Sequence, residues 1–310
     1  MIRSCLGYVT FHILHFILLS KYQIYNLQYT IFVMRSEVLG LPVDILSRRE
    51  TTEKIEGWLK TPSQRPRMVV TAYSEFFVAA QKDKVFSDIV KKADLVTPDG
   101  ISVLAAVKYI KKTQKLKNSK TQMKVLRMLG EGVKVGGEIL SGKVGESVTG
   151  VWLFSELTKM AEKRNWKVFL LGGWGDVSLR TSKMLLERFP RLRVTYDSGE
   201  NRVGTDRVVD EQVVKKINAF KPDLLFVQYN PVKQEKWISS HLTRLKAGVV
   251  MGVGGTFNEY LGDFRPAPAW MEVVGLKWLW RMLVEPKRVG RIFRAVVVFP
   301  WLVFKASLTS

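Results

Sequence analysis

The chain has 310 residues, 46% of them hydrophobic, and carries a formal net charge of +21 at pH 7. This apolar content supports a folded core and excludes general disorder. The single cysteine, Cys5, excludes an internal disulfide, and with only three histidines the chain has no Cys/His zinc site. The positive charge indicates attraction to a polyanion, which can be nucleic acid, an acidic membrane leaflet or a phosphorylated substrate.

Residues 1–34 differ from the rest of the chain. The apolar run at 5–19 contains Thr10, His12 and His15, and it is shorter than the roughly 18–20 residues that span a bilayer. No small-residue cleavage site follows it, so a secretory signal is a poor match. Three interpretations stay open: an anchor lying on a membrane, a degenerate transmembrane segment, or translated upstream sequence with the true start at Met34. We favour the last, because the first well-patterned element begins just beyond Met34.

The first half of the remaining chain alternates short apolar runs with helical patterns. We expect strands at 38–45, 68–71 and 94–97, and helices ending near 59 and covering 74–81, 84–92 and 101–110. A strongly basic tract follows at 111–120, and 121–149 has no clear period. Residues 111–146 are therefore predicted to form a partly helical insertion on the surface.

The second half continues the alternation. It predicts helices at 151–164, 178–189 and 206–220, and strands at 167–171, 192–196, 224–227 and 249–253. Strands that alternate with helices predict an α/β fold with a mostly parallel sheet covered by helices on both faces.

Residues 222–255 read as a strand–helix–strand unit. In parallel sheets, ligands bind beyond the carboxyl ends of the strands, where loops lead into helices. Here that edge carries Lys233 and Gln234 at a helix start, which suits a phosphorylated ligand. The alternative is an ordinary unit of this kind with a solvated first helical turn.

Asp99 stands in a Pro-Asp-Gly turn between a predicted strand and a predicted helix. A carboxylate at this place can act as a general base, a role that contributes about 10²- to 10⁴-fold in rate. The alternative is structural, because Asp in such turns commonly bonds the nearby backbone.

Two groups of glycines, around Gly172-Gly173 and Gly254-Gly255, would let the backbone approach a diphosphate. Neither matches a Rossmann or a Walker loop, so tight strand–helix turns are the alternative. The sequence has no D-x-D carboxylate pair, and no metal site is predicted. A reaction without a metal needs positive side chains on the leaving diphosphate. Three arginines lie on roughly one helical face and suit this role: Arg281, Arg288 and Arg291.

The C-terminal residues 265–310 combine tryptophans with basic residues. Their spacing suggests amphipathic helices broken at Pro286, and the apolar run at 295–304 is too short to span a bilayer. This composition fits a helix lying in a lipid headgroup layer, where each basic residue contributes about 1 kcal/mol. The alternative is a helix that packs its tryptophan face onto the core. Nucleic acid is disfavoured as a partner, because no DNA- or RNA-reading module is recognisable.

Four blocks together resemble the WecG/TagA/CpsF family of bacterial glycosyltransferases, with the match running over 38–294 and interrupted at 111–146. The blocks are VVTAYSEFF (69–77), ADLVTPDGISV (93–103), FLLGG (169–173) and PDLLFVQYNPVKQEKW (222–237), the last continuing through GVGGTF.

The resemblance implies an inverting, metal-independent transferase with a Rossmann-like core and no cofactor, bound peripherally to the cytoplasmic face of the plasma membrane. Its partners would be a UDP-sugar donor, typically carrying N-acetylmannosamine, a polyprenyl-diphosphate-linked sugar acceptor and an anionic membrane surface. The resemblance assigns Asp99 as the base, Thr71 and Gln234 to substrate binding, and the three arginines to the diphosphate.

Some positions depart from the family pattern. Tyr73 stands where the family usually has Asn, and Trp152 stands where it has Asp. Both changes fall at sugar-contacting or loop-shaping places, so Tyr73 is counted among the expected substrate contacts and the donor sugar stays open.

We therefore predict an apolar extension at 1–35, a catalytic domain at 36–264 and a membrane-associating appendage at 265–310, with a homo-oligomer possible. Two other functions stay open. A non-catalytic nucleotide or lipid-glycan binder would have no evident need for Asp99, Gln234 and the arginines. A nucleotide-dependent oxidoreductase would be expected to carry a G-x-G-x-x-G motif, which is missing.

Overall fold

The structure is a computed structural model that describes residues 35–61, 63–116, 121–199, 207–263, 268, 271, 277–284 and 289–309. The chain divides into two compact units at residue 36. The predicted N-terminal extension lies outside the described residues, apart from its last residue. The second unit, Glu37–Ser310, contains the central sheet and the helices that cover it.

Six parallel strands form the central sheet in the order β4-β3-β8-β7-β5-β6. Three of them, β4, β7 and β8, are fully buried and consist mainly of apolar residues, as expected where helices cover both faces of a sheet. The α/β, Rossmann-like fold predicted from the sequence is confirmed. The strands are β3 (Arg67–Ala72), β4 (Leu95–Pro98), β5 (Lys167–Gly172), β6 (Arg193–Asp197), β7 (Leu224–Gln228) and β8 (Val249–Gly252).

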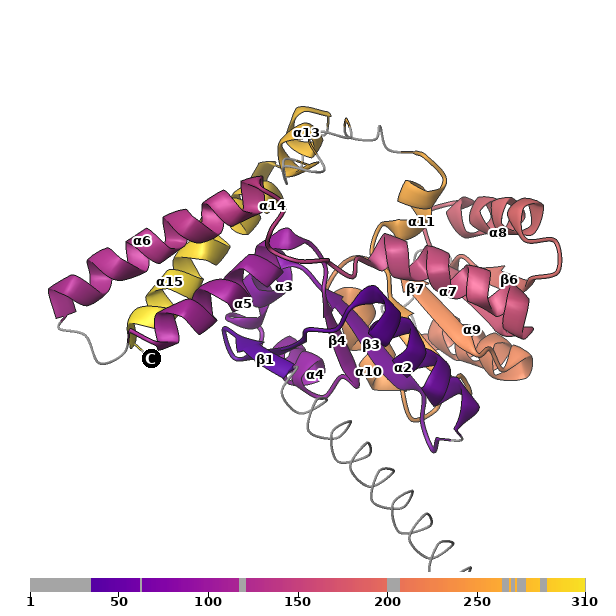
Figure 1. Ribbon diagram of the computed structural model, residues 1–310. Coiled ribbons are helices and arrows are strands. Elements are labelled where there is room, and N and C mark those ends of the chain that lie inside the picture. Colours follow the sequence, from indigo (N-terminus) through magenta and orange to yellow (C-terminus); the bar gives the residue numbers. More distant parts are fainter. Residues whose placement is uncertain are drawn as a thin grey trace, which may run out of the picture. The chain divides into compact units, whose positions relative to one another are not determined.

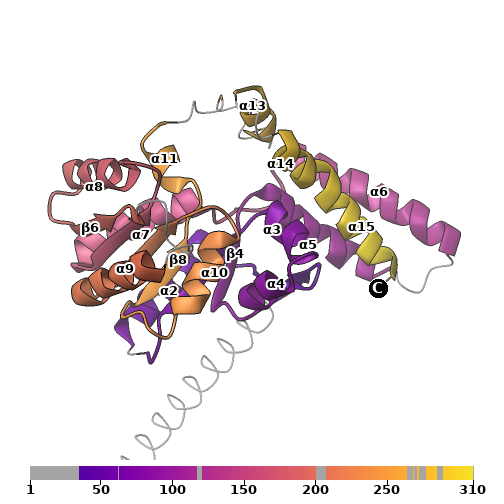
Figure 2. The same cartoon turned by 180° about the vertical axis from the view of Figure 1, so that it is seen from behind.

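Helices cover the two faces of the sheet and form two hydrophobic clusters with it. On one face these are α2 (Arg48–Lys60), α7 (Gly150–Arg164), α8 (Val177–Arg188) and α11 (Thr256–Tyr260). On the other face they are α3 (Ser74–Ala80), α4 (Lys84–Lys91), α5 (Ile101–Gln114), α9 (Arg207–Phe220) and α10 (Lys233–His241). The helices α2 and α7 lie in front of the sheet in Figure 1, whereas α9 and α10 lie in front of it in Figure 2.

The expected single strand at 38–45 is wrong in one respect. The structure has two short strands, β1 (Arg35–Val38) and β2 (Leu41–Asp44), which pair in a small sheet of their own. Leu39 and Gly40 separate them, and both have positive φ angles of 50° and 79°. Positive φ at both central residues is typical of the two-residue turn that reverses a hairpin.

The predicted insertion contains more helix than expected. The helix α5 runs on to Gln114, and α6 (Thr121–Leu140) is an uninterrupted helix of 20 residues. Its charged residues recur at helical spacing, and its apolar residues cover both a buried and an exposed part of its surface. Met128 and Val135 are buried, while Leu126 and Val133 on the other side are exposed.

The C-terminal region contains α13 (Lys277–Val284) and then α14 (Val289–Phe293), a π-helical turn η3 (Arg294–Val298) and α15 (Phe299–Thr309). The last three form one helix of 21 residues, whose most apolar window of 18 residues has a mean hydropathy of 1.6. By length and composition it could cross a membrane. The expectation that the apolar run is too short to span is therefore wrong, because the helix extends past it on both sides. The predicted break at Pro286 lies outside the described residues.

This C-terminal helix rests on α3 and α5 through Phe299 and Val303, which are buried. The ring of Phe299 lies 5.5 Å from that of Phe77. Trp301 is 59% exposed, so within the described residues the helix does not pack onto the core through this tryptophan.

Candidate active site

Three side-chain oxygens converge at the carboxyl edge of the sheet around Gly150, the first residue of α7. A methyl group added to Gly150 would lie 3.2 Å from Thr71 Oγ1, 3.4 Å from Asp99 Oδ2 and 3.5 Å from Thr256 Oγ1. These residues come from the ends of the neighbouring strands β3, β4 and β8, and carboxyl ends of parallel strands meet at one edge. The topology therefore assembles a polar cluster from segments far apart in the sequence.

Asp99 is held by one hydrogen bond of its backbone and one of its carboxylate. The Asp99 backbone N–H donates to Ala72 O at 2.9 Å, and Asp99 Oδ2 accepts from the Gly150 N–H at 2.9 Å. Gly100, with φ of 103°, turns the chain directly into α5. The carboxylate thus stands at the first turns of both α5 and α7, where the helix dipoles favour negative charge.

Arg291 reaches this edge from the C-terminal helix. Its Nε donates to Glu75 Oε2 at 2.9 Å and its Nη2 donates to the Tyr73 hydroxyl at 3.1 Å. Burial raises the pKa of Tyr73, the Arg291 charge opposes that rise, and the carboxylates of Glu75, Glu235 and Asp99 add to it. Tyr73 therefore stays protonated and lies within electrostatic reach of both Arg291 and Asp99.

The two other predicted arginines cannot be placed in the same way. Arg288 and the side chain of Arg281 lie outside the described residues. Their assignment to the diphosphate stays a prediction.

Gln234 and Glu235 form a buried link between the start of α10 and the loop after β8. Gln234 Oε1 accepts from the Gly254 N–H at 3.0 Å, and its Nε2 donates to Glu235 Oε1 at 2.7 Å. Glu235 Oε2 accepts from the N–H of Val232, whose φ is 71°. Burial raises the pKa of Glu235 to about 7, although these hydrogen bonds lower it. Gln234 thus shapes the loop that carries Gly254.

The remaining predicted substrate contacts lie in strand–helix turns, where local packing also explains two of the glycines. A methyl group on Gly172 would lie 2.3 Å from Gln228 O, and one on Gly173 would lie 3.0 Å from Val177, so tight chain packing accounts for both glycines. Lys233 is half-buried in the first turn of α10, and Gly255 precedes α11. Their contact with substrate stays a prediction.

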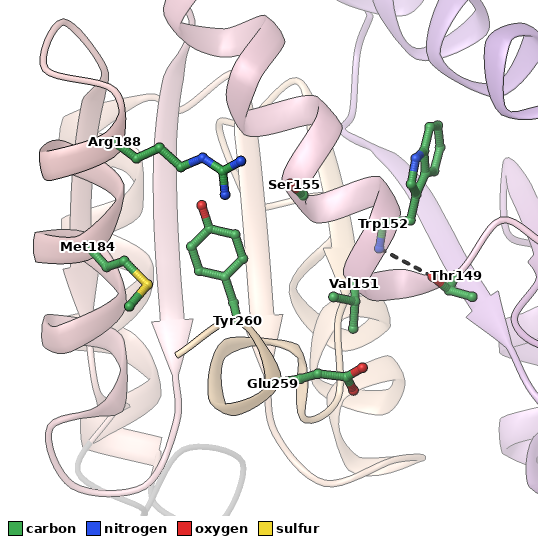
Figure 3. A pocket seen from close by; sticks show the side chains of 8 residues that line it. All are labelled: Thr149, Val151, Trp152, Ser155, Met184, Arg188, Glu259 and Tyr260. Atoms are coloured by element: carbon green, nitrogen blue, oxygen red, sulfur yellow. Dashed lines mark hydrogen bonds between the residues drawn. The ribbon is translucent and has the colours of Figure 1, made fainter. Parts of the chain in front are cut away.

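A pocket of about 450 Å³ opens beside the polar cluster, since two of its lining residues flank Gly150 in the chain. The hydroxyl of Tyr260 is buried and has no hydrogen-bond partner among the described residues. The side chains of Arg188 and Tyr260 project into the space between α7 and α8 (Figure 3). The lining consists of Thr149, Val151, Trp152, Ser155, Met184, Arg188, Glu259 and Tyr260.

Trp152 lines this pocket at the position where the family pattern has Asp. Its backbone N–H donates to Thr149 Oγ1 at 3.2 Å, which caps α7, and the guanidinium carbon of Arg48 lies 4.9 Å from the centre of its ring. The position at which the family pattern has a carboxylate is thus occupied by a neutral indole that packs beside Arg48, and in Figure 3 this ring points away from Arg188 and Tyr260.

Sequence reasoning singled out Thr71 and Asp99 but missed Gly150 and Thr256 as members of the same cluster. Thr256 follows the glycines of the GVGGTF block, and Gly150 follows Thr149 in the segment where the family pattern is broken. Within the described ranges, no group of three or more His, Cys, Asp or Glu side chains is arranged to hold a metal ion.

Comparisons with known proteins agree with the sequence blocks. The model of the glycosyl transferase WecG/TagA/CpsF family matches residues 36–125 and 112–310. Curated relatives named N-acetylglucosaminyldiphosphoundecaprenol N-acetyl-beta-D-mannosaminyltransferase, from Staphylococcus aureus strains MRSA252 and NCTC 8325, are 26% identical over 271 residues, which cover 87% of this chain and 92% of each relative. The family resemblance predicted from the sequence is confirmed. The chain belongs to the WecG/TagA/CpsF family of glycosyl transferases.

Proposed function

We propose that this chain transfers an N-acetylmannosamine-like sugar from a UDP donor to a polyprenyl-diphosphate-linked sugar, with inversion, during synthesis of a cell-surface polymer such as teichoic acid. The observation that carries the proposal is the Asp99 carboxylate, which Gly150 holds beside Thr71 and Thr256 at the carboxyl edge of the sheet. The names of the curated relatives supply the sugar and the acceptor class.

In the proposed reaction Asp99 acts as general base. It accepts the proton of the acceptor hydroxyl while the acceptor oxygen bonds to the anomeric carbon. The bond from that carbon to the UDP oxygen breaks on the opposite face, and UDP leaves with the electron pair. Thr71 and Thr256 stand close enough to Asp99 to hydrogen-bond sugar hydroxyls and so orient the acceptor or the donor sugar.

The pocket beside Gly150 suits the nucleotide of the donor. Its volume of about 450 Å³ lies within the range of small-molecule sites, and it combines aromatic walls with a few polar groups. The buried Tyr260 hydroxyl, without a partner among the described residues, offers a hydrogen bond to the base or ribose. Trp152 changes one wall of this pocket, so the donor sugar can differ from that of the relatives.

The departing diphosphate needs positive charge nearby. Arg291 can provide it, because it is fixed by Glu75 and Tyr73 at the same edge of the sheet. The start of α7 adds backbone N–H groups and the positive end of a helix dipole. Independence from metal ions stays a prediction, and full turnover in the presence of EDTA is the expected result.

A lipid-linked acceptor places the proposed reaction at a membrane. The exposed, apolar C-terminal helix Val289–Thr309 is the described element best suited to meet it. We infer peripheral attachment to the cytoplasmic face of the plasma membrane through this helix and the basic residues around it.

The test is the variant Asp99→Asn, with UDP release followed in the presence of UDP-N-acetylmannosamine and a polyprenyl-diphosphate-sugar analogue. We expect turnover to fall at least a hundredfold, while the Kd for UDP changes less than threefold. Asp88→Asn on α4 is the matched control and should keep full turnover. Unchanged turnover in Asp99→Asn would remove Asp99 as the base.

The same assay separates the transferase from the alternative, a non-catalytic binder. A wild-type chain that binds UDP but releases none from any UDP-sugar, with any acceptor analogue, would favour the binder. The departures at Tyr73 and Trp152 are the observations that keep this alternative worth testing.

A further inference from the structure

The helix α6 presents an apolar face to solvent along its whole length. Leu126, Leu129 and Val133 are 66%, 51% and 77% exposed. Met123 and Leu140, near the two ends of the helix, are 50% and 61% exposed. Steps of three, four and seven residues place these side chains on one side of a helix, opposite the buried Met128 and Val135. A soluble surface helix would carry polar residues on this side.

Contiguous apolar surfaces of this kind mark a protein or membrane contact rather than ordinary exposed surface. The helix does not need this face for its own packing. Its other side already fills the contact with α5, and α5 and α6 are held together by ion pairs of Lys108 and Lys112 with Glu138. The exposed side is therefore open to a further partner.

The neighbouring helix indicates which partner. α6 runs beside the C-terminal helix in both views (Figures 1 and 2), and Lys124 Nζ donates to Leu308 O at 3.1 Å. Phe293 and Trp301 on that helix are 57% and 59% exposed, and only 11% of its most apolar window is buried. The two helices thus form one lobe that is apolar on the outside.

The charge around this lobe fits an anionic bilayer. In the sequence from 108 to 143 the only acidic residues are Glu131 and Glu138, and both are paired with lysines. Basic residues are far more numerous, namely Lys108, Lys111, Lys112, Lys115, Lys117, Lys120, Lys124, Arg127, Lys134 and Lys143. Apolar residues accompanied by an excess of lysine and arginine are typical of helices that lie at the boundary of headgroups and acyl chains.

We propose that α6 is a second membrane-contacting helix, whose Leu126–Leu129–Val133 face enters an anionic bilayer beside the C-terminal helix. The choice of a bilayer as the occupant rests on the proposed function, because a polyprenyl-linked acceptor is presented there. In this arrangement the insertion between α5 and α7 gives the catalytic domain a second point of attachment, which fixes its orientation on the membrane.

The first test uses the full-length chain carrying both Leu126→Gln and Val133→Gln, with sedimentation of vesicles made of phosphatidylcholine and 30% phosphatidylglycerol. We expect the partition coefficient to fall at least tenfold. The matched control carries Leu186→Gln and Val208→Gln, exposed apolar residues on α8 and α9, and should bind like the wild type. Equal binding of the α6 variant and the wild type would overturn the proposal.

The second test reports on contact directly and does not depend on destabilisation. A polarity-sensitive dye is attached at Leu126→Cys in a Cys5→Ser background, with Val208→Cys as the control. On addition of the same vesicles, the emission at 126 should shift to the blue and that at 208 should not. A blue shift at 126 that needs no vesicles, and grows with protein concentration together with a dimer in sedimentation velocity, would assign this face to a second copy and overturn the proposal.

Failure of the inference and failure of the proposed function are distinguishable. Vesicle binding and dye emission need no sugar transfer, whereas UDP release with a water-soluble, short-chain acceptor analogue needs no vesicles. A chain that turns over in solution but shows no contact at position 126 keeps its activity and loses the second attachment point.

Discussion

The absence of a side chain at Gly150 lets three side-chain oxygens lie close to its Cα. Gly150→Ala would place a methyl group 3.2 Å from Thr71 Oγ1 and 3.4 Å from Asp99 Oδ2. Alanine suits the first turn of a helix better than glycine, but Thr71 must shift slightly to admit the methyl group, so the two effects oppose each other and the melting temperature should change little. We expect kcat/KM for sugar transfer to fall at least tenfold.

Gly57→Ala provides the matched control, because a methyl group there meets nothing within 4 Å and the residue lies inside α2. It should stabilise the fold by about 0.5–1 kcal/mol and leave turnover unchanged. Full activity in Gly150→Ala would show that substrate does not occupy the space between Thr71 and Asp99.

Glu235 gives the stability of the chain a specific pH dependence. Burial raises its pKa from 4.5 to about 7 in the folded state, so between these values the folded chain holds a proton that the unfolded chain has lost. The free energy of unfolding therefore falls as the pH rises from about 4.5 to about 7, by up to about 3 kcal/mol from this group. Urea unfolding at pH 5 and pH 8 measures the difference.

The variant Glu235→Gln lacks the titrating group and should lose this part of the pH dependence. Glu53→Gln is the control, because Glu53 is an exposed residue on α2. Its free energy of unfolding should depend on pH as that of the wild type does. If the free energy of unfolding of Glu235→Gln depended on pH as strongly as that of the wild type, Glu235 would not be a buried carboxyl with a raised pKa.

The residues of the candidate site were only partly predictable from the sequence. Asp99 and Thr71 end recognisable strands, and parallel strands bring their carboxyl ends to one edge. Gly150 and Thr256 join them because β3 lies between β4 and β8 in the sheet. This order of strands in space differs from their order along the chain and could not be predicted from it. The polar cluster is therefore a product of the topology.

Among the elements, the C-terminal helix is the one that connects the candidate site with the outer, apolar lobe. Arg291 is fixed to the core by Glu75 and Tyr73, and Phe299 packs into the core on the same helix. Any movement of this helix relative to α3 therefore moves Arg291 relative to the edge of the sheet. In the proposed reaction, attachment of the lobe to a membrane would therefore be mechanically coupled to the placement of Arg291 near the diphosphate.

Arg291→Lys tests this coupling, because lysine keeps the charge but cannot bond Glu75 and Tyr73 through a planar fork. We expect kcat to fall at least tenfold with little change in vesicle binding. Arg294→Lys is the matched control, since Arg294 donates to the other oxygen of Glu75 at the longer distance of 3.4 Å. It should lower kcat less than threefold. Equal losses in the two variants would show that the Tyr73 contact is irrelevant to transfer.

Sequence patterns predicted the helices and strands of the catalytic core well, because each strand is a short apolar run bounded by turn residues. They failed for α6 and for the length of the C-terminal helix. Both helices carry apolar residues on the side that faces away from the protein as well as on the side that faces it. In α6 the helical period is nevertheless present in the charged residues, which recur at steps of three and four as Lys124, Arg127, Glu131, Lys134 and Glu138, so the absence of a period in the prediction for 121–149 is wrong.

At the scale of the whole molecule, the proposed membrane contact combines two attractions, that of the net charge of +21 and that of the apolar lobe. Charge attraction to anionic lipids is screened by salt over about 10 Å at 0.1 M and about 3 Å at 1 M, whereas burial of apolar side chains in the bilayer is not weakened in this way. We expect binding to vesicles with 30% phosphatidylglycerol to weaken at least tenfold between 50 mM and 500 mM NaCl. A residual part should persist at high salt.

Vesicles of pure phosphatidylcholine separate the electrostatic contribution to binding from the apolar one. Binding to these should be weak and nearly independent of salt, and it should match the residual binding to anionic vesicles at 500 mM NaCl. Binding to anionic vesicles that does not change with salt would mean that apolar insertion alone holds the protein.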